Sequence, residues 1–318
     1  MIDLEVRELR YFTAVAEELN FSRAAERLGM AQPPLSRAIR QLERRLGVQL
    51  FERSNRHVML TVAGLTLLDE ARRALDAISA AARRTRRAAQ ETPTLVVTAK
   101  PGVATNLLQR IVAAYCRLPG APRVEFAVSG FGEQAHMVRD GRADVALLGS
   151  PHDLLGLDAE ELITEPRVAA LPIGHQLARR AALRCGDLAG LPMPQWPGSS
   201  ASSRDYWSGR DLLSATRDGP ESPDEPPVHG PAVRDSSQLL EAVALGQAVA
   251  LIPQSLAEHN RRDDVTYRPV TDASHYSIVI AWPEHSCAQW TARFVRTSIE
   301  LTAGGDGVEL TREVAEAS

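Results

Sequence analysis

The chain of 318 residues is 44% hydrophobic and 5% aromatic, which is typical of a globular protein with about two or three domains. It contains no apolar run near the ~18 residues that a membrane-spanning helix needs, and its N-terminus lacks a basic-then-apolar secretion signal, so we expect no membrane partner. The formal net charge of −4 is uneven, because residues 1–91 carry 16 arginines against 12 acidic residues. A basic N-terminal part on an acidic body indicates nucleic acid as the partner of that part.

Cysteine and histidine usage indicates neither a disulfide framework nor a metal site. Cys116, Cys185 and Cys287 are far apart and form no CxxC pair, which predicts reduced thiols in the cytoplasm. The eight histidines show no metal-ligand spacing, so we expect no metal and no other cofactor. Lys100 is the only lysine of the chain, a bias that we attribute to base composition.

The N-terminal residues predict a compact set of helices. Residues 4–19 form an amphipathic pattern whose apolar face contains Leu9, Phe12, Val15, Ala16 and Leu19. Residues 21–47 then give two short helices separated by a break at residues 29–31. Ser22 is the expected cap of the first helix and Gly29 its stop. Pro33 and Pro34 open the second helix, where their missing amide hydrogens cost nothing.

The second of these helices has the two faces that a DNA-reading helix needs. Its apolar stripe recurs at helical spacing: Leu35, Ile39, Leu42 and Leu46. Its opposite face is cationic and rich in hydrogen-bond donors: Gln32 at the entrance, then Ser36, Arg37, Arg40 and Arg44. Such a pair of helices is typical of a helix-turn-helix whose second helix enters the major groove. The alternative is an ordinary helical hairpin whose arginines are only solvated.

A basic β-hairpin follows the helix pair. Residues 48–61 alternate apolar and polar residues around Ser54-Asn55, and Arg53, Arg56 and His57 lie near the tip. A hairpin in this place predicts a wing whose arginines contact phosphates or the minor groove. Simple solubility is the alternative explanation for these arginines.

The stretch from Leu9 to Gly64 resembles the DNA-binding domain of LysR-type transcriptional regulators. The residues that carry the resemblance are Ala24-Ala25, Leu28, Gln32, Ser36, Leu42-Glu43, Leu46-Gly47, Leu50-Phe51, Arg53, Leu60-Thr61 and Ala63-Gly64. Similarity to that family implies DNA contacts from Gln32, Pro33, Ser36 and Arg37, with Arg53 in the wing. It also implies a homodimer or homotetramer on double-stranded DNA, and RNA polymerase as a further partner.

Residues 61–90 predict one long helix without proline. Leu68, Ala71, Leu75, Ile78 and Ala82 follow heptad-like spacing, which predicts a seam for a second copy. A helix that packs on its own domain is the alternative. In the LysR family this position belongs to a linker helix that dimerises the DNA-binding domains. The basic run at residues 83–87 is expected to be solvated, and Thr92-Pro93 marks a boundary.

From residue 94 onward strands alternate with helices, which predicts βαβ units and a mostly parallel sheet. The expected strands are 95–99, 124–129, 143–149, 232–234, 249–253 and 276–282, and the expected helices are 103–116, 131–141, 204–216, 236–245 and 288–302. A second such unit is expected to begin in residues 168–178 and to continue through 191–197. Residues 219–231 are expected to form a proline-rich surface loop. This order resembles the effector-binding part of LysR-type regulators, which implies two subdomains similar to periplasmic binding proteins.

The expected fold is therefore an α+β multidomain chain. Residues 1–64 form a winged helix-turn-helix, 65–92 the linker helix and 93–302 an α/β effector domain, followed by a loose tail at 303–318. Within the effector domain, subdomain I takes residues 93–167 and 270–302, and subdomain II takes 168–269.

An enzymatic role is the weaker interpretation of the second half. Gly130, Gly132 and Ala135 satisfy the letter of a GxGxxA dinucleotide fingerprint. The next strand, however, ends in Gly149-Ser150 and offers no acid for a ribose hydroxyl, so an ordinary strand-to-helix turn is favoured. No nucleophile elbow or phosphate-binding loop is present in the sequence, and no catalytic residue is predicted.

The effector site is expected beyond the carboxyl ends of the strands, where ligands bind in open α/β sheets. The segments concerned are Lys100-Pro101-Gly102, Ser129-Gly130-Phe131, Pro197-Gly198-Ser199-Ser200 and Ser236. Helix N-termini with free amides, together with the charge of Lys100, predict a small carboxylate as the effector, with Phe131 against its apolar part. A solvated Lys100, and a DNA-binding protein without any ligand, remain the alternatives.

Overall fold

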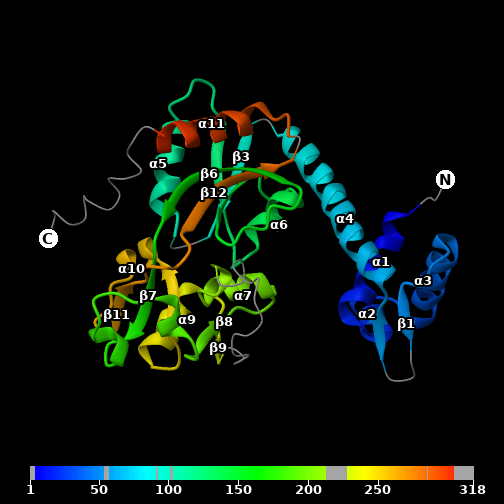
Figure 1. Cartoon of the computed structure of the whole chain (residues 1–318). Coiled ribbons are helices and arrows are strands. Elements are labelled where there is room, and N and C mark those ends of the chain that lie inside the picture. Colours follow the sequence, from blue (N-terminus) through cyan, green and yellow to red (C-terminus); the bar gives the residue numbers. More distant parts are fainter. Residues whose placement is uncertain are drawn as a thin grey trace. The chain divides into compact units, whose positions relative to one another are not determined.

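The computed structural model describes residues 4–53, 57–90, 92–100, 103–212, 228–284 and 286–303. The chain forms two compact units, Met1–Gln90 with Arg139–Arg142, and Glu91–Val138 with Ala143–Ser318 (Figure 1). Arg56, Pro101, Gly102, most of the proline-rich loop and the expected tail lie outside the described residues. No helix within the described ranges is long and apolar enough to cross a membrane.

Three helices at the start of the first unit form the predicted helix-turn-helix. They are α1 (Val6–Glu18), α2 (Phe21–Arg27) and α3 (Gln32–Leu46). The cap of α2 is Asn20 and not Ser22, because the Asn20 side chain accepts hydrogen bonds from the backbone N–H groups of Ser22 and Arg23 at 2.9 and 3.1 Å. Ser22 already lies inside the first turn. Gly29 has φ +65°, the left-handed conformation expected where α2 stops.

The wing is anchored to α3 by a buried carboxylate. Strands β1 (Phe51–Arg53) and β2 (Val58–Leu60) pair antiparallel. Glu43 of α3 is only 3% exposed and accepts hydrogen bonds from the N–H groups of Leu50 and Phe51 at 3.0 and 3.3 Å. These bonds fix the start of the hairpin relative to α3, since both backbone donors would otherwise be buried without partners.

The long helix α4 (Val62–Ala88) packs on its own domain over its first turns. Leu68, at 8% exposure, and Ala71 belong to the same hydrophobic core as Phe12 and Leu35, and Leu75 packs against that core. The prediction that Leu68 lies in an intermolecular seam is therefore corrected. Ile78 is 39% exposed, so the free part of the seam lies further along the helix.

Part of the basic run of α4 is paired and not merely solvated, contrary to expectation. Residues 139–142 belong to the same unit, and Arg83 donates to the Asp140 carbonyl at 3.1 Å while Arg87 donates to the Gly141 carbonyl at 2.7 Å. A Cβ atom at Gly141 would come within 2.7 Å of the Ala80 Cα. The close approach therefore requires a glycine at position 141.

The second unit contains a five-stranded sheet in the order β4-β3-β5-β12-β6. The strands are β3 (Thr94–Ala99), β4 (Arg123–Val128), β5 (Val145–Gly149), β6 (Leu157–Glu165) and β12 (Tyr276–Pro283). Strand β3 is parallel to β4 and β5, whereas β12 is antiparallel to β5 and β6. Helices α5 (Thr105–Tyr115) and α11 (Gln289–Ala303) share a hydrophobic core on one face, and α6 (Gln134–Arg139) packs in a separate core with β5 and β12 residues (Figure 1).

The three-stranded sheet of this unit is antiparallel, which corrects the expectation of a mostly parallel arrangement. Strand β7 (Arg167–Pro172) lies between β10 (Ala250–Pro253) and β11 (Val265–Pro269). Helices α9 (Ser236–Ala244) and α10 (Gln254–His259) pack against it. A short parallel pair, β8 (Met193–Gln195) and β9 (His229–Ala232), and helix α7 (Ala201–Trp207) complete this side.

The chain passes between the two sheets around Pro166 and again between residues 269 and 276, and one buried cation joins the two passages. Arg167 is 1% exposed. Its Nε donates to the Ser274 carbonyl and its Nη1 to the Tyr206 carbonyl, both at 2.6 Å, and the guanidinium lies 3.9 Å from the Tyr206 ring centroid. Arg167 thus holds the C-terminal end of α7 against both crossover segments.

Candidate functional site

The predicted DNA-reading face of α3 is largely open. Gln32, Pro33, Arg37 and Arg40 are all exposed. Ser36 differs, because it is 8% exposed and its hydroxyl accepts a hydrogen bond from the Gln32 side-chain amide at 2.7 Å. Placing Ser36 on the outward face was therefore wrong for this unit taken by itself.

The arginines of this face are not neutralised by the protein. Among the described residues, no carboxylate forms an ion pair with Arg37, Arg40 or Arg44, although many other arginines of this unit are paired. Arg53 ends strand β1, and Arg56 lies outside the described residues. A row of unpaired guanidinium groups on an exposed helix is a surface that attracts phosphates.

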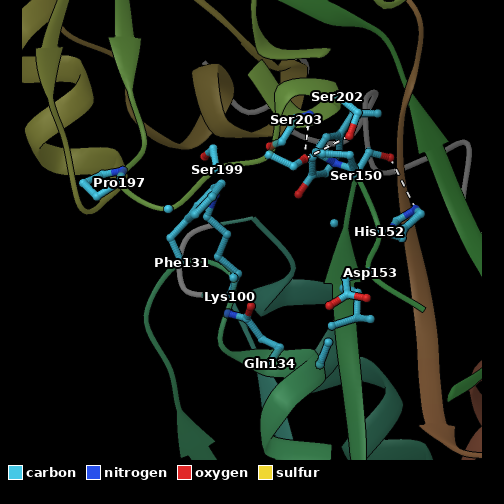
Figure 2. Close-up of a pocket in the computed structure, with 18 residues that line it drawn as sticks. Lys100, Phe131, Gln134, Ser150, His152, Asp153, Pro197, Ser199, Ser202 and Ser203 are labelled. Atoms are coloured by element: carbon cyan, nitrogen blue, oxygen red, sulfur yellow. Dashed lines mark hydrogen bonds between the residues drawn. The ribbon is translucent and has the colours of Figure 1, made fainter. Parts of the chain in front are cut away.

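The second candidate site is a cavity of about 540 Å³ between the two sheets of the second unit (Figure 2). Five of the predicted effector residues line it: Lys100, Phe131, Pro197, Ser199 and Ser200. Gly198 lies within the predicted segment 197–200, and the sequence did not predict the remaining lining residues: Gly132, Gln134, Ala135, Leu148, Gly149, Ser150, Pro151, His152, Asp153, Ser202, Ser203 and Tyr276. The volume is in the range of small-molecule sites.

Ser129, Gly130 and Ser236 were predicted for the site but do not line the cavity. The Ser129 hydroxyl is buried and accepts a hydrogen bond from the Gln134 amide at 2.8 Å, and Gln134 also donates to the Gly130 carbonyl at 2.8 Å. These bonds close the turn between β4 and α6. Ser129 and Gly130 therefore support the wall of the cavity, and Ser236 lies at the start of α9.

A cation beside three aromatic rings forms one end of the cavity. The Lys100 Nζ lies 4.3 Å from the ring centroid of Phe131, 5.1 Å from that of Trp196 and 5.7 Å from that of Trp207. Phe131 and Trp196 are stacked, with centroids 4.0 Å apart and an interplanar angle of 6°. Desolvation lowers the pKa of Lys100 to about 8, because burial disfavours the charged ammonium.

Trp196 and Trp207 belong to this aromatic cluster, and the sequence did not suggest them. Trp196 directly follows β8 and Trp207 ends α7, whereas Lys100 and Phe131 follow β3 and β4. The aromatic cluster is therefore assembled across the space between the two sheets. No local sequence pattern around residues 196 and 207 predicts that these rings contact Phe131 and Lys100. The contact depends on tertiary structure alone.

A polar cluster forms another part of the wall. The Ser150 hydroxyl lies 3.3 Å from the His152 Nε2 (Figure 2). Behind these two lining residues, the Ser277 hydroxyl lies 2.9 Å from the same imidazole nitrogen and 3.0 Å from the Ser150 hydroxyl. Burial lowers the pKa of His152 below its ordinary value. The His152 Nδ1 is buried and finds no hydrogen-bond partner among the described residues. Because no acid orients this imidazole, the cluster lacks the third member of a nucleophilic triad.

Two details of the wall are unusual. A Cβ at Gly149 would lie 1.6 Å from the Tyr276 hydroxyl, so only glycine fits where this tyrosine crosses the floor of the cavity. The Ser199 hydroxyl is buried and has no hydrogen-bond partner among the described residues. A ligand bound in the cavity can supply the hydrogen-bond partner that this buried hydroxyl lacks.

The described residues contain no cluster of three or more histidine, cysteine or acidic side chains that could hold a metal ion. Cys116, Cys185 and Cys287 form no disulfide within the described part of the chain, and burial raises the pKa of Cys185 to about 11. The chemistry offered by the cavity is therefore that of one ammonium group, one carboxylate, several hydroxyls, an imidazole and aromatic surface.

Comparison with known proteins identifies both units. Residues 6–65 match the family model described as "Bacterial regulatory helix-turn-helix protein, lysR family", and residues 88–300 match the one described as "LysR substrate binding domain". The Hca operon transcriptional activator HcaR of Escherichia coli (strain K12) is 31% identical over 284 residues, which cover 88% of this chain and 92% of HcaR. The regulator BudR of Raoultella terrigena is 30% identical over 300 residues, covering 92% of this chain and 99% of BudR.

Solved structures agree with these sequence matches. Full-length BenM is similar with a TM-score of 0.51 and 27% identity, covering 95% of this chain and 97% of BenM. Full-length CbnR complexed with its target DNA has a TM-score of 0.50 and 26% identity, covering 94% of this chain and all of CbnR. These relatives are transcriptional regulators and not enzymes. The chain belongs to the LysR family and is a DNA-binding transcriptional regulator with an effector-binding domain.

Proposed function

We propose that the exposed face of α3 reads base edges in the major groove while the wing contacts the backbone. The proposed DNA contacts are Gln32, Pro33, Arg37, Arg40, Arg53 and Arg56, with Ser36 holding Gln32 in place. The observation that supports this assignment is the row of arginines on α3 without an acidic partner among the described residues. Arginine and glutamine are the side chains suited to bidentate contacts with guanine and adenine.

We propose further that two or four copies act together. The exposed residues of the α4 seam, Ile78 and Ala82, are the surface on which a second α4 would pack, continued by the half-buried Leu75. Two equivalent reading helices would then recognise half-sites about one DNA turn, ~34–36 Å, or a multiple of it apart. Such a complex works on the chromosome in the cytoplasm, with RNA polymerase as its target.

The effector of this regulator, in our proposal, is a small carboxylate that binds in the cavity between the two sheets. The observation that carries the proposal is Lys100, which is the only lysine or arginine lining the cavity and has no ion-pair partner among the described residues. A desolvated ammonium that forms no ion pair within the described residues favours an anionic ligand. The argument from helix N-termini is weaker than expected from the sequence, because α6 and α7 have only 6 and 7 residues.

The test uses the full chain and the DNA upstream of its own gene. Footprints and gel shifts are compared with and without a panel of carboxylates, and ligand binding is measured by calorimetry. Lys100→Met should weaken carboxylate binding at least about 30-fold, since truncating one partner of a buried charge pair costs ~2–5 kcal/mol. The same variant should bind DNA like wild type in the absence of ligand.

Arg179→Met removes an exposed charge away from the cavity and serves as the matched control, so it should bind carboxylates normally. Equal carboxylate affinity in wild type and Lys100→Met would contradict the assignment of Lys100. A regulator that binds DNA but no carboxylate would contradict the effector class.

A further inference from the structure

Resting on the proposed carboxylate site, we infer that the effector is a flat acid with a single negative charge, whose ring lies on Phe131 while its carboxylate meets Lys100. The ring is aromatic or fully conjugated. This narrows the effector from small carboxylates in general to one shape and one charge.

The first observation is a preformed aromatic stack with one covered side. Trp196 is 8% exposed and lies parallel to Phe131 at 4.0 Å. Phe131 lines the cavity, whereas Trp196 does not and therefore lies behind it. A flat ring that enters the cavity can stack on the face of Phe131 that Trp196 does not cover. An offset-stacked aromatic pair is stabilised beyond the burial of its area, a contribution that a puckered aliphatic ring lacks.

The second observation is where the ammonium lies relative to the stack. The two rings are 4.0 Å apart, and the Lys100 Nζ is 4.3 Å from one centroid and 5.1 Å from the other. These distances exclude a position behind either ring, because the farther centroid would then be much more distant. The ammonium lies alongside the pair (Figure 2 shows Lys100 beside Phe131). A carboxylate in the plane of a ring stacked on Phe131 points sideways, toward a cation in this position.

The third observation is the charge balance of the lining. Lys100 is the only lysine or arginine of the lining, and Asp153 is its one carboxylate. His152 has a pKa below its ordinary value, so at neutral pH it is an uncharged hydrogen-bonding group. A second carboxylate on the ligand would find no cation in the lining. The hydroxyls of Ser150, Ser202 and Ser203 are suited to a neutral polar substituent instead.

The test is calorimetry on the full chain with three probes. Benzoate is flat with one charge, cyclohexanecarboxylate has the same charge and nearly the same size but is puckered, and terephthalate is flat with two charges. Wild type should bind benzoate about 3- to 10-fold more tightly than cyclohexanecarboxylate, which corresponds to the energy of one aromatic pair. Terephthalate should bind more weakly than benzoate.

Variants separate the ring contact from the charge contact. Phe131→Leu should remove the preference for benzoate while leaving the affinity for cyclohexanecarboxylate nearly unchanged, and Phe131→Tyr should restore the preference. Lys100→Met should weaken both acids by the same factor. If Phe131→Leu does not fold, the comparison of benzoate with cyclohexanecarboxylate on wild type alone decides.

The outcomes also separate this inference from the proposed function. If wild type binds both monocarboxylates equally and Lys100→Met loses both, the carboxylate site stands and the flat-ring inference is overturned. A preference for terephthalate overturns the single-charge part. If neither these probes nor any other carboxylate binds, the proposal that the effector is a carboxylate is overturned.

Discussion

The two units of this regulator present positive charge in opposite ways. On α3, Arg37, Arg40 and Arg44 extend into water in a row, with no acidic partner among the described residues. In the cavity of the second unit, Lys100 lies among three aromatic rings and its pKa is lowered to about 8. The first arrangement suits a polyanion that is held by many weak contacts. The second suits a small anion that is held by one strong contact out of water.

The two cations also differ in how they respond to burial. A guanidinium stays charged under all conditions in a protein, whereas a lysine ammonium adapts its pKa to burial. Arginine therefore serves the DNA surface, where charge must always be present. At the desolvated position 100 the lysine ammonium has its pKa lowered to about 8, a change that a guanidinium would not make.

Salt should separate the two sites most strongly. If a dimer makes six or more phosphate contacts, DNA affinity should fall by about 10³-fold or more between 50 and 200 mM salt, because condensed counterions are no longer released as favourably. Carboxylate affinity at Lys100 should fall less than about threefold, since a desolvated pair is poorly screened. Fluorescence anisotropy for DNA and calorimetry for the acid give both slopes. Similar slopes would show that the cavity does not bind its ligand through a buried charge.

Assembly should matter for the DNA surface and not for the cavity. Ile78→Asp should give monomers in light scattering and weaken operator binding by about 10²-fold or more. In a dimer, binding of one α3 helix raises the effective concentration of the second α3 helix at its half-site, and a monomer lacks this gain. The carboxylate affinity of the variant should stay within about twofold of wild type, because changes at distant sites that share no partners are nearly independent. Ala77→Asp, at an exposed neighbouring position off the seam, is the control. A native oligomer in Ile78→Asp would remove α4 from the interface.

Single contacts on α3 should have smaller, sequence-dependent effects. Arg37→Ala and Gln32→Ala should each cost about 1–3 kcal/mol on the operator and much less on random DNA. Arg53→Ala should weaken both DNAs alike and reduce the salt slope by about one. Arg10→Ala removes an exposed charge from α1 and should change little. Equal losses on both DNAs for Arg37→Ala would make Arg37 a phosphate contact.

The DNA-binding unit is largely predictable because its information is local. Helical spacing around Leu35, Ile39 and Leu42 identified α3 and its buried side. Ser36 was misplaced because it shares i+3 and i+7 spacing with Ile39 and Glu43, both buried, so the buried side is wider than the apolar stripe. Glu43 is polar in sequence but buried through its bonds to the hairpin.

The effector unit is less predictable because its information is distributed along the chain. Strand ends correctly indicated Lys100, Phe131 and Ser199 as cavity residues. Strand β6 was not predicted, because its four acidic side chains give it the polar composition of a loop. Such charges are common on edge strands, and β6 lies at the edge of its sheet. The aromatic cluster was missed as well, because Trp196 and Trp207 meet Phe131 only after the chain has crossed between sheets.

The smallest expected effect concerns stability and has the opposite sign to the effect on binding. Lys100→Met should raise the free energy of unfolding at pH 7 by about 1–2 kcal/mol. The lowered pKa of Lys100 means that the buried ammonium destabilises the folded state, and the variant removes this cost. The loss of the contacts between the ammonium and the aromatic rings offsets part of the gain. The wild-type penalty is fully present below pH 8 and disappears as pH rises toward the unfolded pKa of 10.5. The gain should therefore shrink by pH 9.5.

Urea unfolding at pH 7 and 9.5 checks this prediction. Arg40→Met, an exposed position on α3, should change stability by less than about 0.5 kcal/mol at either pH. A Lys100→Met protein that is less stable than wild type at pH 7 would mean that the ring contacts outweigh the cost of burial.

The most direct test of the central claim, that a desolvated Lys100 recognises an anion, is an NMR titration of this one side chain. Selective ¹³C labelling of lysine gives a single ε-methylene signal, because the chain contains one lysine. We predict a pKa of about 8 without ligand, and a clear rise when benzoate is present, since a carboxylate partner favours the charged ammonium. An ordinary pKa near 10.5 that benzoate does not change would contradict the account.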